Sequence, residues 1–166
     1  MPKVTCAPRE LAEASTTSGP PSPEKCSQKW RCAGDKIAFA NGCFDLLHPG
    51  HISLLRHATK TADRLIVGLN SDASVRRLKG DTRPLQSVDK RVAALAAFDM
   101  VDAVTIFDED TPQNLIAMVQ PDVILKGGDY NSDDVVGSDI VKKRGGKVVI
   151  VPTLHAYSTS KLIKNL

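Results

Sequence analysis

The chain has 166 residues, of which 42% are hydrophobic and 25% are charged, values typical of a single globular domain. Only 4% are aromatic, and the net charge of +3 comes from 22 basic and 19 acidic residues, which argues against a dedicated nucleic-acid-binding protein. No apolar run reaches the roughly 18 residues of a membrane span, and the first 25 residues lack the apolar core of a secretory signal. We therefore expect a cytoplasmic protein with neither a membrane nor a nucleic acid as its partner.

Residues 1–35 differ in composition from the rest of the chain. Residues 1–21 are rich in proline and small polar residues, so we expect a flexible N-terminal arm. The order Ser22-Pro23-Glu24 is typical of a helix start, with a cap, a first-turn proline and a first-turn acid. Gly34 would end this short helix, and residues 36–166 would then form the main domain.

Five short apolar runs follow, separated by amphipathic stretches of helical period. The runs are rich in β-branched residues and do not alternate with polar ones, as expected for parallel strands covered on both faces. This alternation predicts a doubly wound, Rossmann-like α/β fold with a five-stranded parallel sheet. The runs are Ile37–Ala40, Leu65–Leu69, Val101–Phe107, Val123–Leu125 and Val148–Val151.

The four cysteines do not form a pair with the CxxC spacing of zinc or redox motifs. We therefore expect reduced thiols that take part in neither a disulfide nor a metal site. These residues are Cys6, Cys26, Cys32 and Cys43.

The segment Asn41–His51 follows the first expected strand and runs into a helix. His48 and His51 are three residues apart, which places both imidazoles on one face of the helix start, where backbone N–H groups and the dipole attract anions. Gly50 would let a phosphate approach the backbone closely, and the imidazoles could share the charge that develops on a reacting phosphorus. The alternatives are two histidines that only cap the helix, or a zinc site, for which no third ligand lies nearby.

Basic residues are concentrated after the second expected strand. Residues 70–91 contain six basic and three acidic side chains, an excess that suits a polyphosphate and its leaving pyrophosphate. Lys79 before Gly80 is the strongest candidate, because a loop position would let its flexible ammonium group reach the phosphates. For the other basic residues the alternative is a solvated helix face. The six are Arg76, Arg77, Lys79, Arg83, Lys90 and Arg91.

Two later segments offer further ligand contacts. Lys126–Asp129 follows the fourth strand, where paired glycines allow close approach and Asp129 could accept hydrogen bonds from sugar hydroxyls, unless the segment is only a tight turn. Near the C-terminus, Ser158, Thr159 and Ser160 place hydroxyls at the start of a short helix. They predict either a second phosphate site or an ordinary helix cap.

The order Gly-x-Phe-Asp-x-x-His-x-Gly-His in residues 42–51 resembles the cytidylyltransferase-like family of nucleotidyltransferases. Within that family, residues 36–166 are similar to the adenylyltransferase domain of bacterial ADP-heptose synthases. The most specific segments are 41–51 and Leu125–Tyr130. The resemblance implies transfer of AMP from ATP to D-glycero-β-D-manno-heptose 1-phosphate, with release of pyrophosphate, for lipopolysaccharide or a related glycan. It also implies Mg²⁺ with the ATP, for which no protein ligand is assigned, and it is compatible with a homodimer.

The resemblance also implies roles for individual residues. His48, His51 and Lys79 would be catalytic and would hold the reacting phosphates. The nucleotide would be bound by Cys43, Phe44, His48, Gly50, His51, Lys79, Arg91, Ser158, Thr159 and Ser160. The sugar phosphate would be bound by Asp45, Lys126, Gly128 and Asp129.

Three positions depart from the family pattern. Ala40 replaces a commoner threonine, Ala156-Tyr157 stands where a glycine often begins the last motif, and Ser160 replaces a threonine but keeps its hydroxyl. The departure at Ala156 falls in the loop that the resemblance places over the nucleotide.

Two other functions remain open on the sequence. One is a cytidylyltransferase that acts on glycerol 3-phosphate or a similar phosphoalcohol, and the other is a regulatory module that binds a nucleotide without turnover. The first uses the same scaffold, whereas the intact His48, Gly50, His51 and Lys79 argue against the second. Since the fused ADP-heptose synthases also carry a sugar-kinase domain, a chain of 166 residues is expected to be a free-standing transferase.

Overall fold

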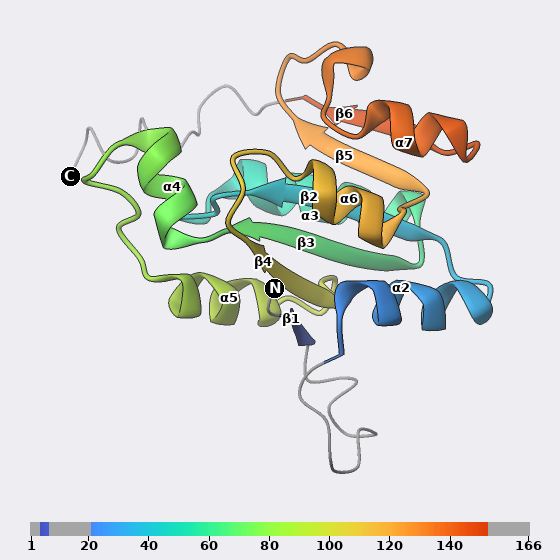
Figure 1. The fold of residues 1–166 in the computed structure, drawn as a ribbon, viewed down its shortest axis with the longest axis horizontal. Coiled ribbons are helices and arrows are strands. Elements are labelled where there is room, and N and C mark those ends of the chain that lie inside the picture. The colour runs from blue at the N-terminus through green and yellow to red at the C-terminus, as the bar shows by residue number, and fades with distance from the viewer. Residues whose placement is uncertain (1–3, 7–20, 153–166) are drawn as a thin grey trace.

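A single six-stranded sheet runs through the centre of the protein (Figure 1). The computed structural model describes residues 4–6 and 21–152. The strands are β1 (Val4–Cys6), β2 (Ile37–Gly42), β3 (Arg64–Asn70), β4 (Ala103–Phe107), β5 (Val123–Gly127) and β6 (Lys147–Val151). Their order is β1-β4-β3-β2-β5-β6, and all neighbours are parallel except β1 and β4. The predicted α/β fold with five parallel strands is confirmed.

The strand β1 is the one element of the sheet that the sequence did not predict. It lies within residues 1–21, which were expected to form a flexible arm, yet Val4 pairs with Thr105 and Cys6 with Ala103 of β4. A three-residue strand is too short to show a period, and its pairing depends on the exposed edge of β4. The expectation of a flexible arm is therefore wrong for residues 4–6, and the rest of the expected arm up to residue 20 lies outside the described residues.

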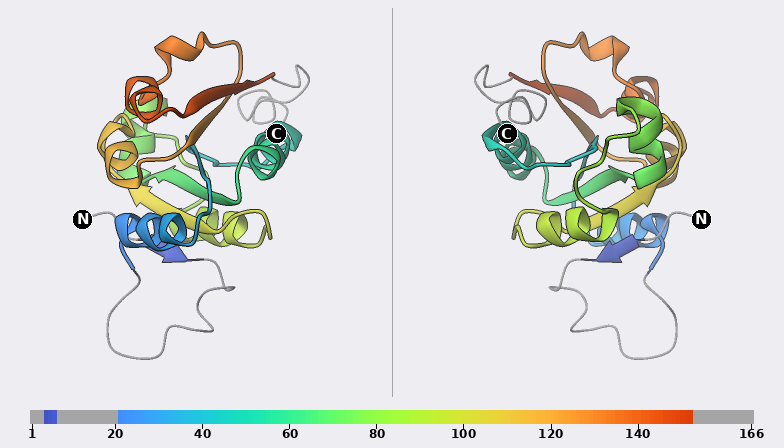
Figure 2. Two further views of the ribbon diagram at one scale, coloured as in Figure 1. Left: turned by 90° about the vertical axis from the view of Figure 1, so that its right-hand side faces the viewer. Right: turned by 90° about the vertical axis from the view of Figure 1, so that its left-hand side faces the viewer.

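Helices cover both faces of the sheet (Figure 2). One face packs against α3 and α5, and the other against α2, α6 and α7, so the core is divided into two clusters. Successive strand residues point to opposite faces, and accordingly Ala38 belongs to the first cluster while Phe39 belongs to the second. The helices are α2 (Pro23–Cys32), α3 (Pro49–Thr61), α4 (Asp72–Lys79), α5 (Val88–Ala96), α6 (Gln113–Val119) and α7 (Ser138–Lys143), with a 3₁₀ turn η1 (Ser132–Asp134).

The helix ends follow the expected signals in most places. Ser22 caps α2 by accepting a hydrogen bond from the Lys25 N–H, and Pro23 is its first residue, as predicted. The expected loop position of Lys79 is wrong, because Ser71 caps a further helix, α4, whose last residue is Lys79 and whose C-cap is Gly80. None of the helices within residues 21–152 combines the length and the hydropathy needed to span a bilayer.

The chain order places a crevice between β2 and β5. From β2 the chain adds β3 and β4 on one side, and it then crosses to add β5 and β6 on the other side. At such a reversal the loops that follow the two central strands diverge, which leaves room for a ligand beyond their carboxyl ends. The segment after β2 contains the two histidines, and the segment after β5 contains the paired glycines.

Candidate active site

A cavity of about 630 Å³ opens at the carboxyl ends of β2 and β5. The predicted site residues that line it are Cys43, Phe44, Asp45, His48, Gly50, His51, Lys79 and Lys126. Three other predicted residues, Arg91, Gly128 and Asp129, do not line it, and Ser158, Thr159 and Ser160 lie outside the described residues. The fold therefore brings together most of the predicted residues that the structure describes.

The two histidines form a stacked pair at the start of α3. Their ring centroids are 3.7 Å apart with an angle of 23° between the planes, and His51 also packs against Phe44 at 4.9 Å. Pro49 and Gly50 begin the helix directly after His48. Pro49 has no N–H group and the His51 N–H donates to the His48 carbonyl at 2.9 Å, so Gly50 offers the first backbone N–H group at this helix start. The Nδ1 atoms of both histidines are buried without a hydrogen-bond partner among the described residues. Because these atoms have almost no solvent-accessible surface, a ligand in the cavity would meet the other ring nitrogen, Nε2, of each histidine.

Both imidazoles are neutral at pH 7. Burial lowers the pKa of His48, and burial together with the neighbouring His48 lowers the pKa of His51 to about 4. A neutral imidazole still carries one N–H group, which it can donate to a phosphate oxygen. The pair therefore offers hydrogen-bond donors without a prior positive charge.

We expect the stability of the protein to fall as the pH is lowered from about 6.5 to about 4. In this window His51 binds a proton in the unfolded chain but not in the folded protein, so acid favours unfolding. Urea unfolding across this pH range checks the prediction, and His51→Gln should show a shallower pH dependence than the wild type. An identical pH dependence of the two proteins would contradict the assignment to His51.

Arg91 on α5 joins the segments that carry the site, although it does not line the cavity. Its side chain is fully buried, and its Nη1 donates to the carbonyls of Cys43 at 2.7 Å and Asn70 at 2.9 Å. Its Nη2 donates to the Asp72 carboxylate at 2.7 Å, and its Nε donates to the Gln86 carbonyl at 3.1 Å. Four protein acceptors thus occupy the guanidinium group, which ties the ends of β2 and β3 to the start of α4.

Asp45 fixes the segment that follows α4. Its buried carboxylate accepts hydrogen bonds from the N–H groups of Leu85 at 2.9 Å and Gln86 at 3.0 Å, and from Nε of Arg83 at 2.7 Å. Burial alone would raise its pKa, but these donors together lower the pKa of Asp45 below its ordinary value. The carboxylate is therefore ionised and already engaged, and its contact to a sugar remains a prediction.

Three basic side chains face the cavity from different elements. Lys79 ends α4, Arg83 lies in the next segment, and Lys126 belongs to β5. Within the described part of the chain, Arg83 is ion-paired, whereas Lys79 and Lys126 have no ion pair. Burial, and to a smaller extent the charge of Lys79, lowers the pKa of Lys126, whose Nζ lies 5.5 Å from the ring centre of Tyr130. Uncompensated cations in a partly buried cavity favour an anionic ligand.

Cys43 lies at the centre of this positive region. Burial raises the pKa of its thiol, and the charges of Lys79, Arg91 and Arg83 oppose that rise. Its Sγ is 4.0 Å from Oδ1 of Asn70, which itself ends β3 and lines the cavity. The positive charges of Lys79, Arg91 and Arg83 therefore act together at the position of the Cys43 thiol.

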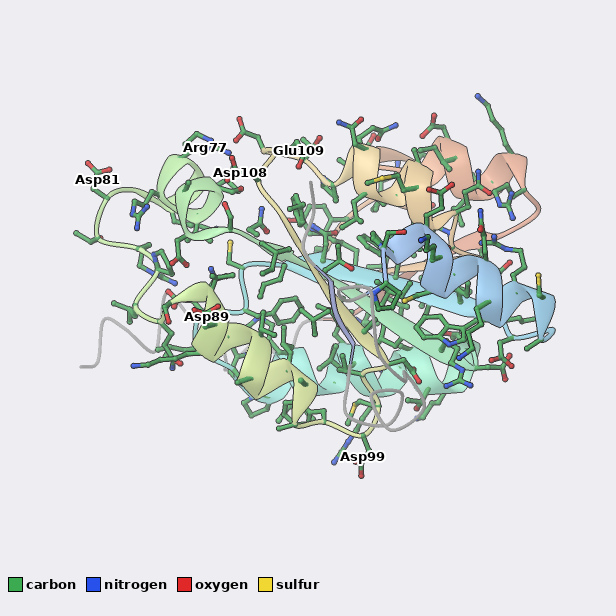
Figure 3. The ribbon with its side chains drawn as sticks, turned by 60° about the horizontal axis from the view of Figure 1, so that its bottom comes forward. Arg77, Asp81, Asp89, Asp99, Asp108 and Glu109 are labelled. Atoms are coloured by element: carbon green, nitrogen blue, oxygen red, sulfur yellow. The ribbon has the colours of Figure 1, made fainter. Side chains whose placement is uncertain are left out.

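The helix α4 is fastened to the segment that follows β4. Nε of Arg77 donates to the Asp110 carboxylate at 2.9 Å, and its Nη2 donates to the carbonyl of Asp108. Figure 3 shows Arg77 beside Asp108 and Glu109. Since Lys79 and Asp110 both line the cavity, these bonds hold two of its walls together.

Exposed apolar side chains gather at the rim of the same cavity. Leu78, Tyr130 and Val136 are 46%, 53% and 37% exposed, and all three line it. They come from α4, from the segment after β5 and from the segment before α7. An apolar rim around a basic interior fits a ligand that has both phosphates and a planar or carbon-rich part.

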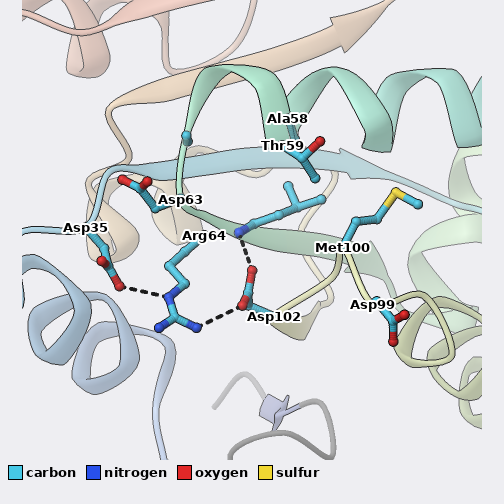
Figure 4. Close-up of a pocket in the computed structure, with 10 residues that line it drawn as sticks. Asp35, Ala58, Thr59, Asp63, Arg64, Asp99, Met100 and Asp102 are labelled. Atoms are coloured by element: carbon cyan, nitrogen blue, oxygen red, sulfur yellow. Dashed lines mark hydrogen bonds and ion pairs between the residues drawn. The ribbon is translucent and has the colours of Figure 1, made fainter.

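A second cavity, of about 640 Å³, lies at the opposite ends of the strands (Figure 4). Its Arg64 donates to Asp35 at 2.8 Å and to Asp102 at 3.1 Å, and Asp102 also accepts from the Leu65 N–H. Asp63 accepts from the Lys36 N–H. These carboxylates hydrogen-bond to strand and loop residues of the protein, so a structural role explains this acidic cluster without a ligand.

The described residues do not provide a metal site of their own. No group of three or more histidine, cysteine or acidic side chains in residues 4–6 and 21–152 is placed to hold a metal ion. Near the cavity, Asp45 is bonded to Arg83 and two backbone N–H groups, and Asp110 is paired with Arg77.

Sequence reasoning did not single out Arg83 or Tyr130. For Arg83 the only signal was a local excess of positive charge, which does not distinguish a cavity residue from a solvated one. Its partner Asp45 is 38 residues away in sequence, so the ion pair emerges only from the fold. For Tyr130 the signal was its place after the paired glycines at the end of β5.

Comparison with known proteins identifies relatives of this chain. Residues 39–165 match the family model described as Cytidylyltransferase-like. The chain is 55% identical over 135 residues to the bifunctional protein HldE of Nitrobacter winogradskyi, and 56% identical over 138 residues to that of Rhodospirillum rubrum. The two matches cover 81% and 83% of this chain and 28% of each relative, so the chain spans less than a third of their length.

A solved structure is also similar. The crystal structure of the lipopolysaccharide core biosynthesis protein from Thermoplasma volcanium superposes with a TM-score of 0.58 and 30% identity, covering 72% of this chain and 97% of that chain. The region matched by the family model, residues 39–165, contains most of the parallel sheet and the cavity at the ends of β2 and β5. Because the family model spans well over half of its length, this chain belongs to the cytidylyltransferase-like family.

Proposed function

We propose that the protein transfers AMP from Mg·ATP to D-glycero-β-D-manno-heptose 1-phosphate, giving ADP-heptose and pyrophosphate. The observation that carries the proposal is the stacked pair of His48 and His51, which faces a cavity with two lysines that form no ion pair within residues 4–6 and 21–152. The motifs around the pair resemble those of ADP-heptose synthase adenylyltransferase domains. The similarity to a lipopolysaccharide core biosynthesis protein supports a sugar phosphate as the acceptor.

The proposed chemistry is a direct in-line displacement. An anionic oxygen of the sugar phosphate attacks the α-phosphorus of ATP, a new P–O bond forms, and the bond to the β-phosphate breaks so that pyrophosphate leaves with the electron pair. The nucleophile is already ionised, so no general base and no covalent enzyme intermediate are needed. Catalysis then consists of positioning and of stabilising the charge that moves to the transferred and leaving groups.

The residues divide between these tasks. His48 and His51 would donate their N–H groups to the reacting phosphates, and Lys79 would neutralise the growing charge on the leaving pyrophosphate. Backbone groups of Cys43, Phe44 and Gly50 would position the nucleotide, with Ser158, Thr159 and Ser160 on its far side. Arg91 would support this site through the carbonyls of Cys43 and Asn70.

The remaining predicted residues would serve the acceptor sugar. Lys126 lines the cavity, and Gly128 and Asp129 directly follow the end of β5. Gly128 adopts a φ of 123° that glycine tolerates, and its N–H donates to the Val151 carbonyl, so the turn brings Asp129 to the same end of the sheet. Asp129 is exposed, which leaves its carboxylate available to sugar hydroxyls. Since ATP and sugar phosphates are cytoplasmic metabolites, we propose the cytoplasm as the location.

A matrix of substrates tests the proposal. The purified protein is incubated with ATP or CTP, each with heptose 1-phosphate or glycerol 3-phosphate, and pyrophosphate release is measured. We expect turnover only with ATP and heptose 1-phosphate. The family description makes a cytidylyltransferase the second candidate, and turnover with CTP and glycerol 3-phosphate alone would establish that reaction instead. Nucleotide binding without pyrophosphate release in any combination would support a regulatory module.

A further inference from the structure

Arg83 lines the cavity and has side-chain hydrogen-bond donors without a partner among the described residues. Its side chain is only 15% exposed, and its Nε is held at 2.7 Å by the Asp45 carboxylate. Within the described residues its two terminal nitrogens have no hydrogen-bond partner, although the residue lines the cavity. A planar guanidinium group with two free terminal nitrogens matches two oxygens of one phosphate.

The position of this group is determined by a buried network. The Asp45 side chain is 1% exposed, and it also accepts hydrogen bonds from the N–H groups of Leu85 and Gln86. The carboxylate thereby fixes the backbone on the far side of Pro84 as well as the guanidinium group itself. A buried carboxylate with three donors keeps the arginine in one orientation, which reduces the entropy lost when a ligand binds.

The ion pair with Asp45 also determines whether Arg83 is better suited to the leaving pyrophosphate or to the attacking phosphate. During the reaction the leaving pyrophosphate gains negative charge, whereas the attacking phosphate loses charge as its oxygen becomes bonded to a second phosphorus. Full, unpaired cations favour the leaving group, and Lys79 is such a cation within the described part of the chain. A cation compensated by Asp45 can orient the attacking phosphate while reducing its nucleophilicity less than an unpaired charge would.

We infer that Arg83 binds the phosphate group of the acceptor substrate through its two terminal nitrogens, with Asp45 as its positioning residue. The inference rests on the proposed function, because it assumes that a phosphate monoester is the nucleophile. It assigns the two oxygens that do not attack to the arginine and leaves the third free to reach the α-phosphorus.

The test compares Arg83→Gln with Arg83→Lys and with Arg56→Gln, a matched loss of charge on the exposed surface of α3. Loss of a charge-assisted contact should raise the KM for heptose 1-phosphate by about tenfold to a hundredfold in Arg83→Gln. The dissociation constant for ATP, measured by calorimetry without acceptor, should stay within about twofold of the wild type, because no phosphate of ATP binds this residue. Arg83→Lys should recover little, since one ammonium group cannot hold Asp45 and also form a two-point contact.

Two results would overturn the inference. One is a rise in the ATP dissociation constant as large as the rise in the acceptor KM, and the other is an unchanged acceptor KM in folded Arg83→Gln. Thermal unfolding of each variant establishes folding, and if Arg83→Gln is unfolded, Arg83→Lys takes its place in the comparison.

Failure of the proposed function is recognised separately, by the absence of wild-type turnover with heptose 1-phosphate. In that case, binding of glycerol 3-phosphate and of inorganic phosphate to the ATP-bound protein is followed by NMR. Weaker binding of these probes to Arg83→Gln than to Arg56→Gln supports the phosphate site. Equal binding to the two variants, or no binding to the wild type, overturns it.

Discussion

Replacing His48 or His51 by alanine is expected to lower kcat by about 100-fold to 1,000-fold each, while the KM for ATP changes much less. The reason is that an N–H group aimed at developing charge acts mainly in the transition state. The two rings are stacked at 3.7 Å and border one cavity, so they act on the same phosphate region. Their effects should therefore not add, and the double variant should lose less than the product of the two single losses. Pyrophosphate release under saturating substrates measures these values.

His57, the other histidine within α3, provides the matched control. Its Nδ1 is 2.9 Å from the Ser53 carbonyl, and it is not among the residues that line the cavity. His57→Ala should keep the wild-type rate. Because His51 packs against Phe44, its replacement also removes a packing contact, so the thermal stability of each variant is measured. His51→Asn is included as a variant that keeps a side-chain hydrogen-bond donor. Wild-type pyrophosphate release by the folded double variant would show that the pair is not catalytic.

The sheet was predictable because parallel strands covered on both faces are continuous apolar runs. Residues 37–40 and 123–125 stand out for this reason, and they became the central strands β2 and β5. The polar ends of the strands were not predictable, since Asn41 and Asn70 form ladder pairs through their backbones while their side chains line the cavity. The strand β1 exists through its pairing with β4, and no local pattern of three residues signals such a partner.

The parts of the candidate site that are formed by residues close together in the chain could be predicted from the sequence. The parts that depend on contacts between residues far apart in the chain could not. The two histidines lie on one helix turn, so their spacing alone places them together. Arg91 and Arg83 looked alike in sequence, as members of one basic segment. In the fold, the guanidinium group of Arg91 donates to four protein acceptors, whereas the two terminal nitrogens of Arg83 have no partner among the described residues. That difference depends on the positions of Asp45 and Cys43, which lie 38 residues before Arg83 and 48 residues before Arg91.

Arg91→Met is expected to destabilise the protein by about 3 kcal/mol, because several acceptors of a fully buried guanidinium group lose their donor at once. The methionine fills a similar volume, so the loss reports on polar contacts rather than on a void. The carbonyls of Cys43 and Asn70 would lose their donor, and the Asp72 carboxylate would lose its cation. Urea unfolding of Arg91→Met and the wild type measures the difference. Lys90→Met, an adjacent exposed residue with the same change in charge, should remain close to the wild type.

Arg91→Lys distinguishes a structural role of Arg91, in which it holds three segments together, from a role as a direct ligand of a phosphate. A single ammonium group carries the charge but cannot reach four acceptors on three segments. A structural role therefore predicts loss of stability together with a fall in kcat/KM. A phosphate ligand predicts wild-type stability with a raised KM for ATP. The first result would mean that the Cys43 carbonyl, held at 2.7 Å, sets the path of the chain toward His48. The positions of His48 and His51 would then depend on an arginine that does not contact the substrate, whereas the second result would support the predicted role of Arg91 in nucleotide binding.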